Sequence, residues 1–518
     1  MMRITNSMMT TNTKNNININ KLNEDEKNTQ VSTGQKISRP SDDPVVAIRA
    51  LRFNTTLSQL NQYYDKNIPD ASAWMSTTET ALSQTDEMYD SILQDLTTGA
   101  NDTNTASDRQ KILSNLKGIR DEFYSAGNAD YAGRTVFTGY RTGESLTFLS
   151  TDTDLNDNYK IYQNISGDSI DSYTYITTGD DETDVESYTL NRIRLPYDNL
   201  NQSDSDTLTF DIYTTDSTTG IKTIDSSIDI TTKSIAGLSQ EDIDKIYTEV
   251  GDDKAVLIPE TGEIILGKDV ADALAAADEG SVMIEYNKNS WDSGDLRPEH
   301  YFACEKTPKG GTSADTVQYN FSDEVDESTG DKTGNKIPDF QEQDIEIEVS
   351  YNQKIAVNTH ASDVYKHDIG RDIDDLITAT QDVVDAEEKV SDLEKQLSAA
   401  TTDADKEAIQ AKLDAANKEY SLKKDKMQKM FSEGLDTFQA YADNNNRAIA
   451  DIGSLQSRLS ITKERVSSQL TSFTELADDN INVNLTDAAI DLSNANLALQ
   501  AAQLAASKIA QQTLLNYL

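Results

Sequence analysis

The 518-residue sequence predicts a mainly α-helical protein with an inserted β-rich domain. Residues 1–143 and 371–518 carry helical apolar spacings, whereas residues 144–370 alternate apolar and polar residues in short runs. From Leu376 to Met430, apolar residues also recur at spacings of three and four, which is typical of a coiled coil. We therefore expect a long helical rod or coiled-coil core from both chain termini, a coiled-coil helical hairpin and a β-rich insert.

A polar helix and a turn are expected at the start of the chain. Gly34 should end the first helix, because glycine readily adopts the left-handed conformation of a helix C-cap. The next helix should begin within Pro40–Pro44, with Asp43 as its N-cap and Pro44 at the first helical position. These residues predict a defined turn between two helices.

The second helix should run to about Thr98, a length of about 80 Å at 1.5 Å per residue. Pro69 lies inside it and should kink it, because a proline ring clashes with the carbonyl four residues earlier. A third helix is expected from the capping box Ser107–Gln110 to about Gly127. Arg134–Gly139 then changes to a strand-like pattern.

The middle zone is predicted to be an acidic β-rich domain. Its best strand candidates are Leu208–Tyr213, Ser227–Thr231 and Asp344–Tyr351. Short helices are expected at Ile243–Ile246 and Val270–Ala277. Residues 145–370 hold 47 acidic and 16 basic residues, so most of the net charge of -44 lies in this zone. Such a charge belongs on a solvated surface.

The third zone should contain a helical hairpin over residues 372–430. Thr402–Asp405 has the pattern of a turn with a capping box between two apolar seams. The alternative is one continuous helix with a polar patch. A further helix near Phe431–Leu476 should lie against the helix predicted over residues 44–98.

The last segment, Leu485–Leu518, is unusually apolar. Leucine and alanine occur on more than one of its helical faces, and after Asp491 its only charged residue is Lys508. A helix that is apolar on most sides must be buried. The N-terminal segment is the expected partner, yet two such helices cannot cover all of this surface alone. The sparse apolar contacts expected from that segment are Ile4, Met8, Ile19 and Leu22.

Composition argues against several classes of function. The net charge of -44 disfavours binding to nucleic acids and to anionic membranes. No run approaches the roughly 18 apolar residues of a membrane span, and Met1–Asn20 lacks the apolar core of a secretory leader. Phosphate-cradle and nucleophile-elbow motifs are absent from the sequence. We therefore expect no enzymatic activity, no cofactor and no membrane insertion.

Two weak ligand patterns remain. His300 and Cys304, the single cysteine, are four residues apart, but Pro298 and the lack of further ligands disfavour a metal site. A surface histidine and a small buried cysteine are the expected interpretation. Residues 323–339 offer oxygen ligands and glycine turns for weak calcium binding, but Lys332 and Lys336 favour a solvated acidic loop.

Four segments together resemble a known family. These are Ser32–Pro44 near an N-terminal Met-Arg-Ile, Gly133–Tyr140, Asn446–Arg465 and Leu514–Leu518. In this order, with helical chain ends, they are similar to the hook–filament junction members of the bacterial flagellin family, the third hook-associated proteins. The resemblance covers the two helical ends and hardly touches residues 145–370.

The resemblance implies a terminal coiled-coil polymerisation core (1–40 and 485–518), a helical shaft (41–143 and 371–484) and an outer domain (144–370). It implies export without a cleaved leader through the flagellar type III apparatus, and an extracellular place in the flagellum. The expected partners are further copies in a ring or helical lattice, other hook-associated proteins, flagellin, and an export chaperone at the C-terminal helix. The role would be structural: a connection between hook and filament that forms as the terminal helices fold and polymerise.

Two sets of residues follow from this interpretation. The expected assembly contacts are Ile4, Met8, Leu22, Leu492, Leu499, Leu504, Leu514 and Leu518. The expected turn between core and shaft consists of Gly34, Pro40, Asp43 and Pro44. Flagellin itself, the bulk filament subunit, remains an alternative, as does a secreted adhesin or enzyme acting through the central β domain.

Overall fold

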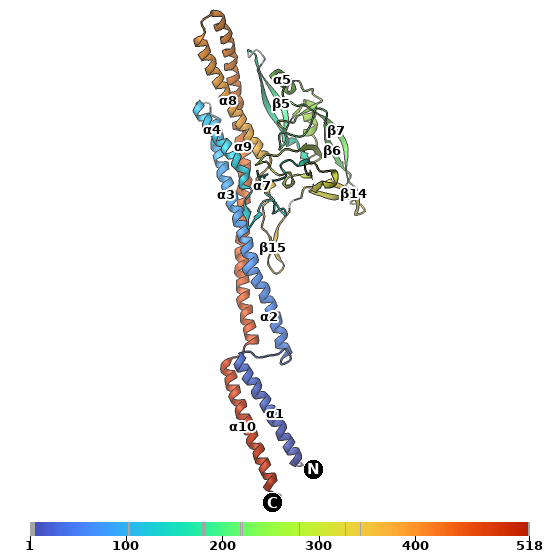
Figure 1. Cartoon of the computed structure of the whole chain (residues 1–518), viewed down its shortest axis with the longest axis vertical. Coiled ribbons are helices and arrows are strands. Elements are labelled where there is room, and N and C mark those ends of the chain that lie inside the picture. The colour runs from blue at the N-terminus through green and yellow to red at the C-terminus, as the bar shows by residue number, and fades with distance from the viewer. Residues whose placement is uncertain are drawn as a thin grey trace. The chain divides into compact units, whose positions relative to one another are not determined.

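The structure is a computed structural model that describes residues 6–101, 104–178, 183–217, 219, 221–278, 280–326, 328–341 and 343–515 (Figure 1). Helices occupy both ends of the chain and a β-sheet lies between them in sequence, so the predicted fold class is confirmed. The chain divides into two compact units. The terminal unit comprises Met1–Ser72, Ile347–Ile355 and Gln456–Leu518, and the central unit comprises Ala73–Glu346 and Ala356–Leu455.

The helices of the described residues follow the predicted order. They are α1 (Asn6–Thr33), α2 (Pro44–Gln62), α3 (Ile68–Gly99), α4 (Ala106–Ala126), α5 (Gln240–Thr248), α6 (Lys268–Ala275), α7 (Ala361–Val364), α8 (Asp368–Ala399), α9 (Asp403–Ile481) and α10 (Leu485–Leu515). A π-helical turn, Tyr63–Asn67, connects α2 to α3, so the helix continues from Pro44 to Gly99.

The irregularity expected at Pro69 takes the form of this π turn. Pro69 has no N–H, and the chain widens just before it, where the N–H of Ile68 donates to the carbonyl of Tyr63 five residues earlier. A strand from the middle of the sequence, β15, supports the turn. In that strand, Glu348 accepts a hydrogen bond from the Tyr63 hydroxyl (2.9 Å), and its carbonyl accepts one from the Asn67 amide (2.7 Å).

The capping box of α4 lies two residues before the predicted one. Thr105 is the N-cap: its hydroxyl accepts from the Asp108 N–H (3.3 Å), and the Asp108 carboxylate accepts from the Thr105 N–H (3.3 Å). The prediction of Ser107–Gln110 as the box was wrong, because two overlapping stretches fit the same four-residue pattern. Gly127 follows the helix as predicted.

The helical hairpin is confirmed, because α8 and α9 lie side by side and antiparallel (Figure 1). Leu393, Leu413 and Ala416 form a buried cluster near its turn. The second helix does not end near Met430. Instead, α9 continues to Ile481 and includes the separate helix predicted over Phe431–Leu476, with no break at Gly434.

As predicted, the later part of α9 packs on the helix that runs from Pro44 to Gly99. Each unit contains a contact that shows this. In the central unit, the Asn445 amide donates to the carbonyl of Leu82 (3.0 Å). In the terminal unit, the rings of Phe53 and Phe473 lie edge to face at 6.3 Å.

The strands of the described residues are more numerous than the predicted runs. They are β1 (Asp130–Tyr131), β2 (Arg134–Thr135), β3 (Asn158–Ile165), β4 (Ile170–Thr178), β5 (Val185–Arg194), β6 (Thr207–Thr215), β7 (Lys222–Thr232), β8 (Ala255–Ile258), β9 (Glu263–Leu266), β10 (Val282–Lys288), β11 (Ala303–Thr307), β12 (Val317–Tyr319), β13 (Phe321–Asp326), β14 (Asp331–Pro338), β15 (Glu346–Ser350) and β16 (Gln353–Ala356).

Among the described residues, ten strands form one sheet in the order β12-β11-β3-β10-β6-β7-β8-β9-β5-β4. The pairings are antiparallel except for β7 with β8. We call this sheet with α5 and α6 the β domain. The three strands and two short helices predicted in the middle zone are all present, whereas the strand predicted at Arg134–Gly139 is limited to Arg134–Thr135.

Neither weak ligand pattern forms a metal site in the described part of the chain, where no group of three or more His, Cys, Asp or Glu residues could hold a metal ion. In the proposed calcium segment, Asp323 pairs with both Lys332 and Lys336. Cys304 is buried as predicted. The expectation of a surface histidine was wrong, because His300 is only 6% exposed.

The burial of His300 has a consequence for the pH dependence of stability. Burial, reinforced by the nearby Arg141 charge, lowers the pKa of His300 to about 4, and the Nε2–H donates to the Ser145 carbonyl (3.1 Å). A histidine in the unfolded chain has a pKa of about 6.5, so the unfolded state binds more protons as the pH falls below that value. Stability is therefore lost as the pH falls from about 6.5 towards 4.

We expect the free energy of unfolding of the central unit to fall by about 2 kcal/mol from this group between pH 7 and pH 5. Urea unfolding at the two pH values measures it. The His300→Gln variant keeps an amide donor for the Ser145 carbonyl but removes the titration, so its pH dependence should be flatter by that amount. An equal slope in both proteins would contradict the assignment.

Candidate assembly surface

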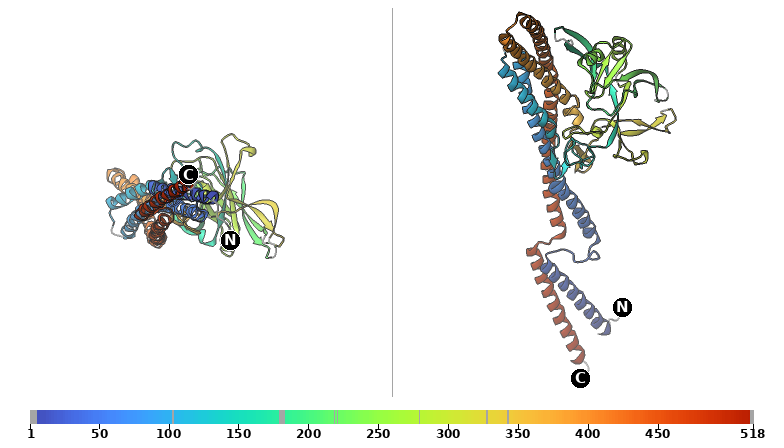
Figure 2. Two further views of the ribbon diagram at one scale, coloured as in Figure 1. Left: turned by 90° about the horizontal axis from the view of Figure 1, so that it is seen from below. Right: turned by 45° about the horizontal axis from the view of Figure 1, so that its top comes forward.

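The two chain ends form an antiparallel pair of helices within the terminal unit, and α1 and α10 lie side by side in both views of Figure 2. Lys27 pairs with Asp491 at 3.5 Å, and further along the pair the Asn20 amide donates to the Ala498 carbonyl (3.4 Å). These two contacts fix the register. The expectation that the N-terminal segment partners the last helix is confirmed.

The seam between the two helices is unevenly built. On α10 it consists of small and medium apolar residues: Ala488, Leu492, Ala495, Leu499, Ala502 and Ala506, all buried or half-buried. On α1 the half-buried positions along the pair are mostly polar and include Thr13, Asn20, Glu24 and Lys27, whereas Ile17 and Val31 are apolar. Because alanine and polar side chains bury little apolar area, this seam stabilises the pair only weakly.

Several larger apolar side chains point away from the seam. On α10, Ile490, Leu497 and Leu504 recur every seven residues and are 54%, 61% and 64% exposed. A seven-residue repeat places them on one face of the helix. On α1, Met8, Ile19 and Leu22 are also exposed. The pair thus presents apolar side chains on each helix that its own partner helix does not cover, and we call the α10 set the exposed stripe.

The predicted assembly contacts fall into three groups. Leu504 lies on the exposed stripe and Met8 and Leu22 are exposed on α1, whereas Leu492 and Leu499 face the α1–α10 seam. Ile4 and Leu518 lie outside the described residues. Leu514 belongs to α10, but its side chain is also outside the described part.

Sequence reasoning did not select Ile490 and Leu497, which belong to the exposed stripe. The signal that could have found them is their spacing of seven from Leu504. Because a heptad repeat returns to the same helical face, one exposed leucine would have indicated the other two positions.

The apolar residues of α1 that were predicted to cover α10 are exposed instead. Because Met8, Ile19 and Leu22 are exposed, the expectation that they supply the buried apolar contacts to the last helix is wrong. Ile17 is half-buried instead, and it lies four residues after Thr13 and three before Asn20. Those spacings place it on the same helical face as the polar seam positions, whereas Ile19 and Leu22 fall on other faces.

The predicted turn between the terminal helices and α2 is built as its residue types suggest. Gly34 has φ of 71° and its N–H donates to the Gln30 carbonyl (2.9 Å), which ends α1. Asp43 is the N-cap of α2, and its carboxylate accepts from the N–H groups of Val45 (2.9 Å) and Val46 (3.2 Å). Pro44 occupies the first helical position, and Pro40 lies in the exposed loop before it.

A second carboxylate, that of Asp42, folds the loop onto itself. It accepts from the N–H groups of Arg39 (2.8 Å) and Ser38 (3.2 Å). The hydrogen bond from the Arg39 N–H, helped by Ser38, holds the pKa of Asp42 below its usual value against a smaller desolvation effect.

The turn is also tied to the segment that joins α9 to α10. The Lys36 N–H donates to the Ile481 carbonyl (2.7 Å), and the Val483 N–H donates to the Gly34 carbonyl (2.9 Å). The segment that joins α1 to α2 and the segment that joins α9 to α10 are therefore hydrogen-bonded to each other within the terminal unit.

Loss of the Asp43 cap should loosen the first turn of α2. The Asp43→Ala variant is expected to lose about 1 kcal/mol at this helix start, while Asp43→Asn, an equally good N-cap, should lose little. Hydrogen exchange at Val45, Val46 and Ala47 measures this, and about fivefold faster exchange is expected in the alanine variant only. Equal exchange rates in the two variants would contradict the capping role.

The described helices include no segment that is long and apolar enough to cross a membrane. The surface of the α1–α10 pair offers exposed apolar side chains, an inter-helix ion pair and hydrogen-bonded linkers. Such a surface can bind another apolar helix face.

Comparison with known proteins finds a match to one family model. Residues 4–142 match the bacterial flagellin N-terminal helical region. Flagellar hook-associated protein 3 of Salmonella typhimurium is 30% identical over 114 residues, which are 22% of this chain and 36% of the relative. The protein of the same name from Escherichia coli is 26% identical over 114 residues, with the same shares of each chain. The matched part thus spans about a third of the length of these curated relatives.

A solved structure of flagellar hook associated protein-3 from Legionella pneumophila aligns with 82% of this chain and 97% of its own, at 9% identity and a TM-score of 0.29. The sequence match over residues 4–142 contains α2, α3, α4 and the turn that precedes α2. Over this N-terminal helical region, the chain is similar to the bacterial flagellin family.

Proposed function

We propose that the protein is a structural subunit of the bacterial flagellum that connects the hook to the filament, as a hook-associated junction protein. The observation that carries this proposal is the match of the N-terminal helical region to the flagellin family, in which both curated relatives are named flagellar hook-associated protein 3. The role requires assembly and needs no catalysis. Bulk filament flagellin is the less favoured alternative, because neither of these relatives bears that name.

The terminal helices would carry out the assembly. Ile490, Leu497 and Leu504 of α10 form an apolar stripe that α1 leaves uncovered. Contact with neighbouring subunits would bury it, and that burial would offset the entropy of ordering two weakly paired helices. Folding of the termini and polymerisation would then be coupled, with residues 1–40 and 485–518 as the core, 41–143 and 371–484 as the shaft and 144–370 as the outer domain.

The partners in this proposal are further copies of the chain in a ring or helical lattice, other hook-associated proteins and flagellin. Export would precede assembly, without a cleaved leader, through the flagellar type III apparatus. A chaperone bound to α10 before export would cover the same apolar stripe that later binds the neighbouring subunits. The Gly34–Pro44 turn would set the angle between core and shaft.

Deletion of the gene tests the proposal. A junction protein is required to attach the filament, so the deletion strain should bear hooks without filaments and should release filament protein into the medium. Expression of the chain from a plasmid should restore filaments. Loss of all filament protein from both cells and medium would instead indicate that this chain is the filament subunit, and normal filaments would contradict both roles.

A further inference from the structure

Among the described residues, the β domain is joined to the helices of the central unit at two main places, and between them the Arg371 side chain of α8 donates to the Thr261 carbonyl in the turn from β8 to β9. The first is the start of α8, where the chain returns from the sheet. There, the Tyr301 hydroxyl donates to the Tyr365 carbonyl (2.7 Å), and the rings of Phe302 and His367 lie 5.1 Å apart. Tyr301, Phe302 and Tyr365 are all buried. This joint is made mainly of packed rings.

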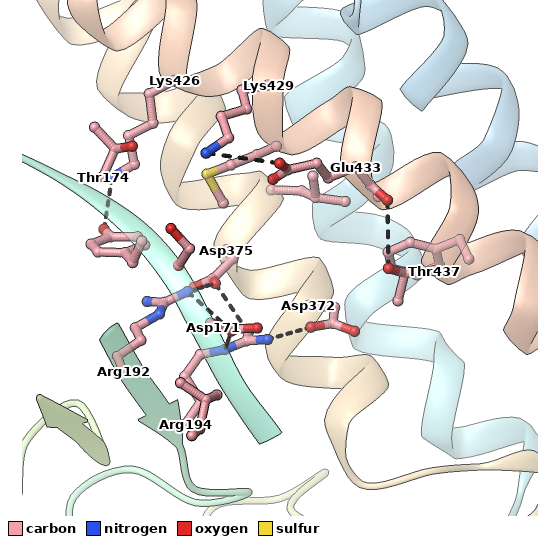
Figure 3. A pocket seen from close by; sticks show the side chains of 17 residues that line it. Asp171, Thr174, Arg192, Arg194, Asp372, Asp375, Lys426, Lys429, Glu433 and Thr437 are labelled. Atoms are coloured by element: carbon pink, nitrogen blue, oxygen red, sulfur yellow. Dashed lines mark hydrogen bonds and ion pairs between the residues drawn. The ribbon is translucent and has the colours of Figure 1, made fainter. Parts of the chain in front are cut away.

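The second joint lies further along α8 and is ionic (Figure 3). It consists of Arg192 and Arg194 of β5, Asp171 of β4, Glu263 of β9, and Asp372 and Asp375 of α8. We call these six side chains the clasp. Asp375 is eight residues beyond His367, a distance of about 12 Å along the helix.

Each arginine of the clasp bonds to both sides of the joint. Arg192 pairs with Glu263 on the sheet and with Asp375 on the helix. Arg194 pairs with Asp171 on the sheet at 3.3 Å, and on the helix with Asp372 and with Asp375 at 3.1 Å. The Arg192 side chain is 3% exposed and that of Arg194 is 12% exposed, so these charges are held mainly by the carboxylates rather than by water.

The helix α9 adds two hydrogen bonds beside the clasp. The Lys426 ammonium donates to the Tyr173 hydroxyl of β4 (2.7 Å), and the Tyr441 hydroxyl donates to Asp372 (2.8 Å). The side chains at this joint therefore come from both helices of the hairpin and from three strands of the sheet.

Close packing does not explain the second joint. A cleft of about 310 Å³ separates β4 from α9, and its walls include Arg192, Arg194, Met430 and Phe438. Where two elements leave such a space between them, apolar burial contributes little to their relative orientation. Buried ion pairs also add little net stability, because desolvation offsets their attraction, but their geometry is directional.

We propose that the clasp is an orientation lock that fixes the angle between the β domain and the α8–α9 hairpin. When the clasp is opened, the β domain swings about the packed rings at the start of α8, and the cleft between β4 and α9 changes width. Arg192 and Arg194 act as positioning residues: they hold two folded parts in one arrangement and are not required for either part to fold. This goes beyond the assembly role proposed above and does not depend on it.

Distance measurements between spin labels test the lock. Labels at Ser226→Cys in β7 and Gln396→Cys in α8 occupy exposed positions, one on each side of the joint. The native Cys304 is buried and should stay unlabelled. With the clasp intact, pulsed electron–electron double resonance on the full chain should give one narrow distance peak.

Two variants open the clasp, and one control does not. The Arg192→Met/Arg194→Met variant removes both cations, and Asp372→Asn/Asp375→Asn removes the helix-side charges while keeping side-chain size. The control, Lys160→Met, removes a cation of β3 whose partner, Glu285, lies on the neighbouring strand β10 of the same sheet. We expect the narrow peak to be lost in both clasp variants and retained in the control.

Circular dichroism on the same samples separates a swing from unfolding. Native spectra together with a broadened distance distribution support the lock. An unchanged narrow peak in both clasp variants overturns it. Loss of the strand signal in both clasp variants overturns it as well, because the arginines would then be needed for folding of the β domain itself.

Discussion

Glutamine at Ile490, Leu497 and Leu504 is expected to abolish self-assembly while leaving the monomer folded. Each of these side chains would lose about 2 kcal/mol of burial in the assembled state, or about 6 kcal/mol together. That corresponds to a rise of about four orders of magnitude in the concentration needed for assembly. Analytical ultracentrifugation and electron microscopy of the purified protein measure this concentration.

A matched control distinguishes the stripe from the helix itself. Ala498 and Ala505 are exposed and each follows a stripe leucine by one residue, so they lie off the face of the stripe, and replacing them introduces glutamine, a good helix former, while removing only methyl groups. The control should assemble as the unmodified protein does. Normal assembly of the triple variant, with its helix content unchanged, would show that the stripe is not the contact surface.

Replacement of Arg297 by methionine should have the largest effect on the stability of the β domain. Arg297 bonds to Asp152 at 2.7 Å and to Asp154 at 2.9 Å, and it is 3.4 Å from Glu299, which is fully buried. Burial alone would raise the pKa of Asp154, but hydrogen bonds from Arg297 and Lys306 outweigh it and lower the pKa to about 2. The variant leaves buried carboxylates without this cation, so a loss of about 3–5 kcal/mol is expected.

Urea unfolding measures that loss of stability. Lys222→Met is the control, because Lys222 is exposed and should contribute less than about 0.5 kcal/mol.

If the termini alone drive assembly, the concentration needed for polymerisation should remain the same in the Arg297 variant below its melting temperature. A stability loss in the Lys222 control equal to that of Arg297→Met would contradict the assignment.

Local signals predicted most of the helices and several strands. Gly34, Asp43 and Pro44 define the first turn by their own conformational preferences, and the structure has the turn they predict. The apolar coiled-coil repeats on either side of Thr402–Asp405 likewise predicted α8 and the start of α9. Such features depend on residues within a few positions of one another, which is why a single sequence is sufficient to find them.

The faces of the terminal helices could be predicted only in part. Apolar residues on more than one side of α10 show that it must be buried, but they do not show which side meets α1. The side of α10 that meets α1 depends on the largely polar seam of α1 and on the pairing of Lys27 with Asp491. These two residues are far apart in the sequence. For this reason the sequence placed Leu492 and Leu499 at the assembly surface, although they face the seam.

Long-range electrostatic contacts gave no usable sequence signal. The clasp joins Arg192 and Arg194 to Asp372 and Asp375 across a wide gap in sequence, in a chain with 90 acidic residues. Against that background no single aspartate stands out. The burial of His300 was missed for a related reason: its surroundings come from the segment around Ser145, which reaches it only in the folded chain.

Immunogold labelling of detached flagella is the most direct test of the central claim, that this chain connects hook and filament. Antibodies against the β domain should label a narrow band between the two structures, and a strain with the triple glutamine variant should lack that band. Label along the whole filament would contradict the junction role and indicate a flagellin. Absence of label from flagella of a strain that expresses the protein would contradict a flagellar role altogether.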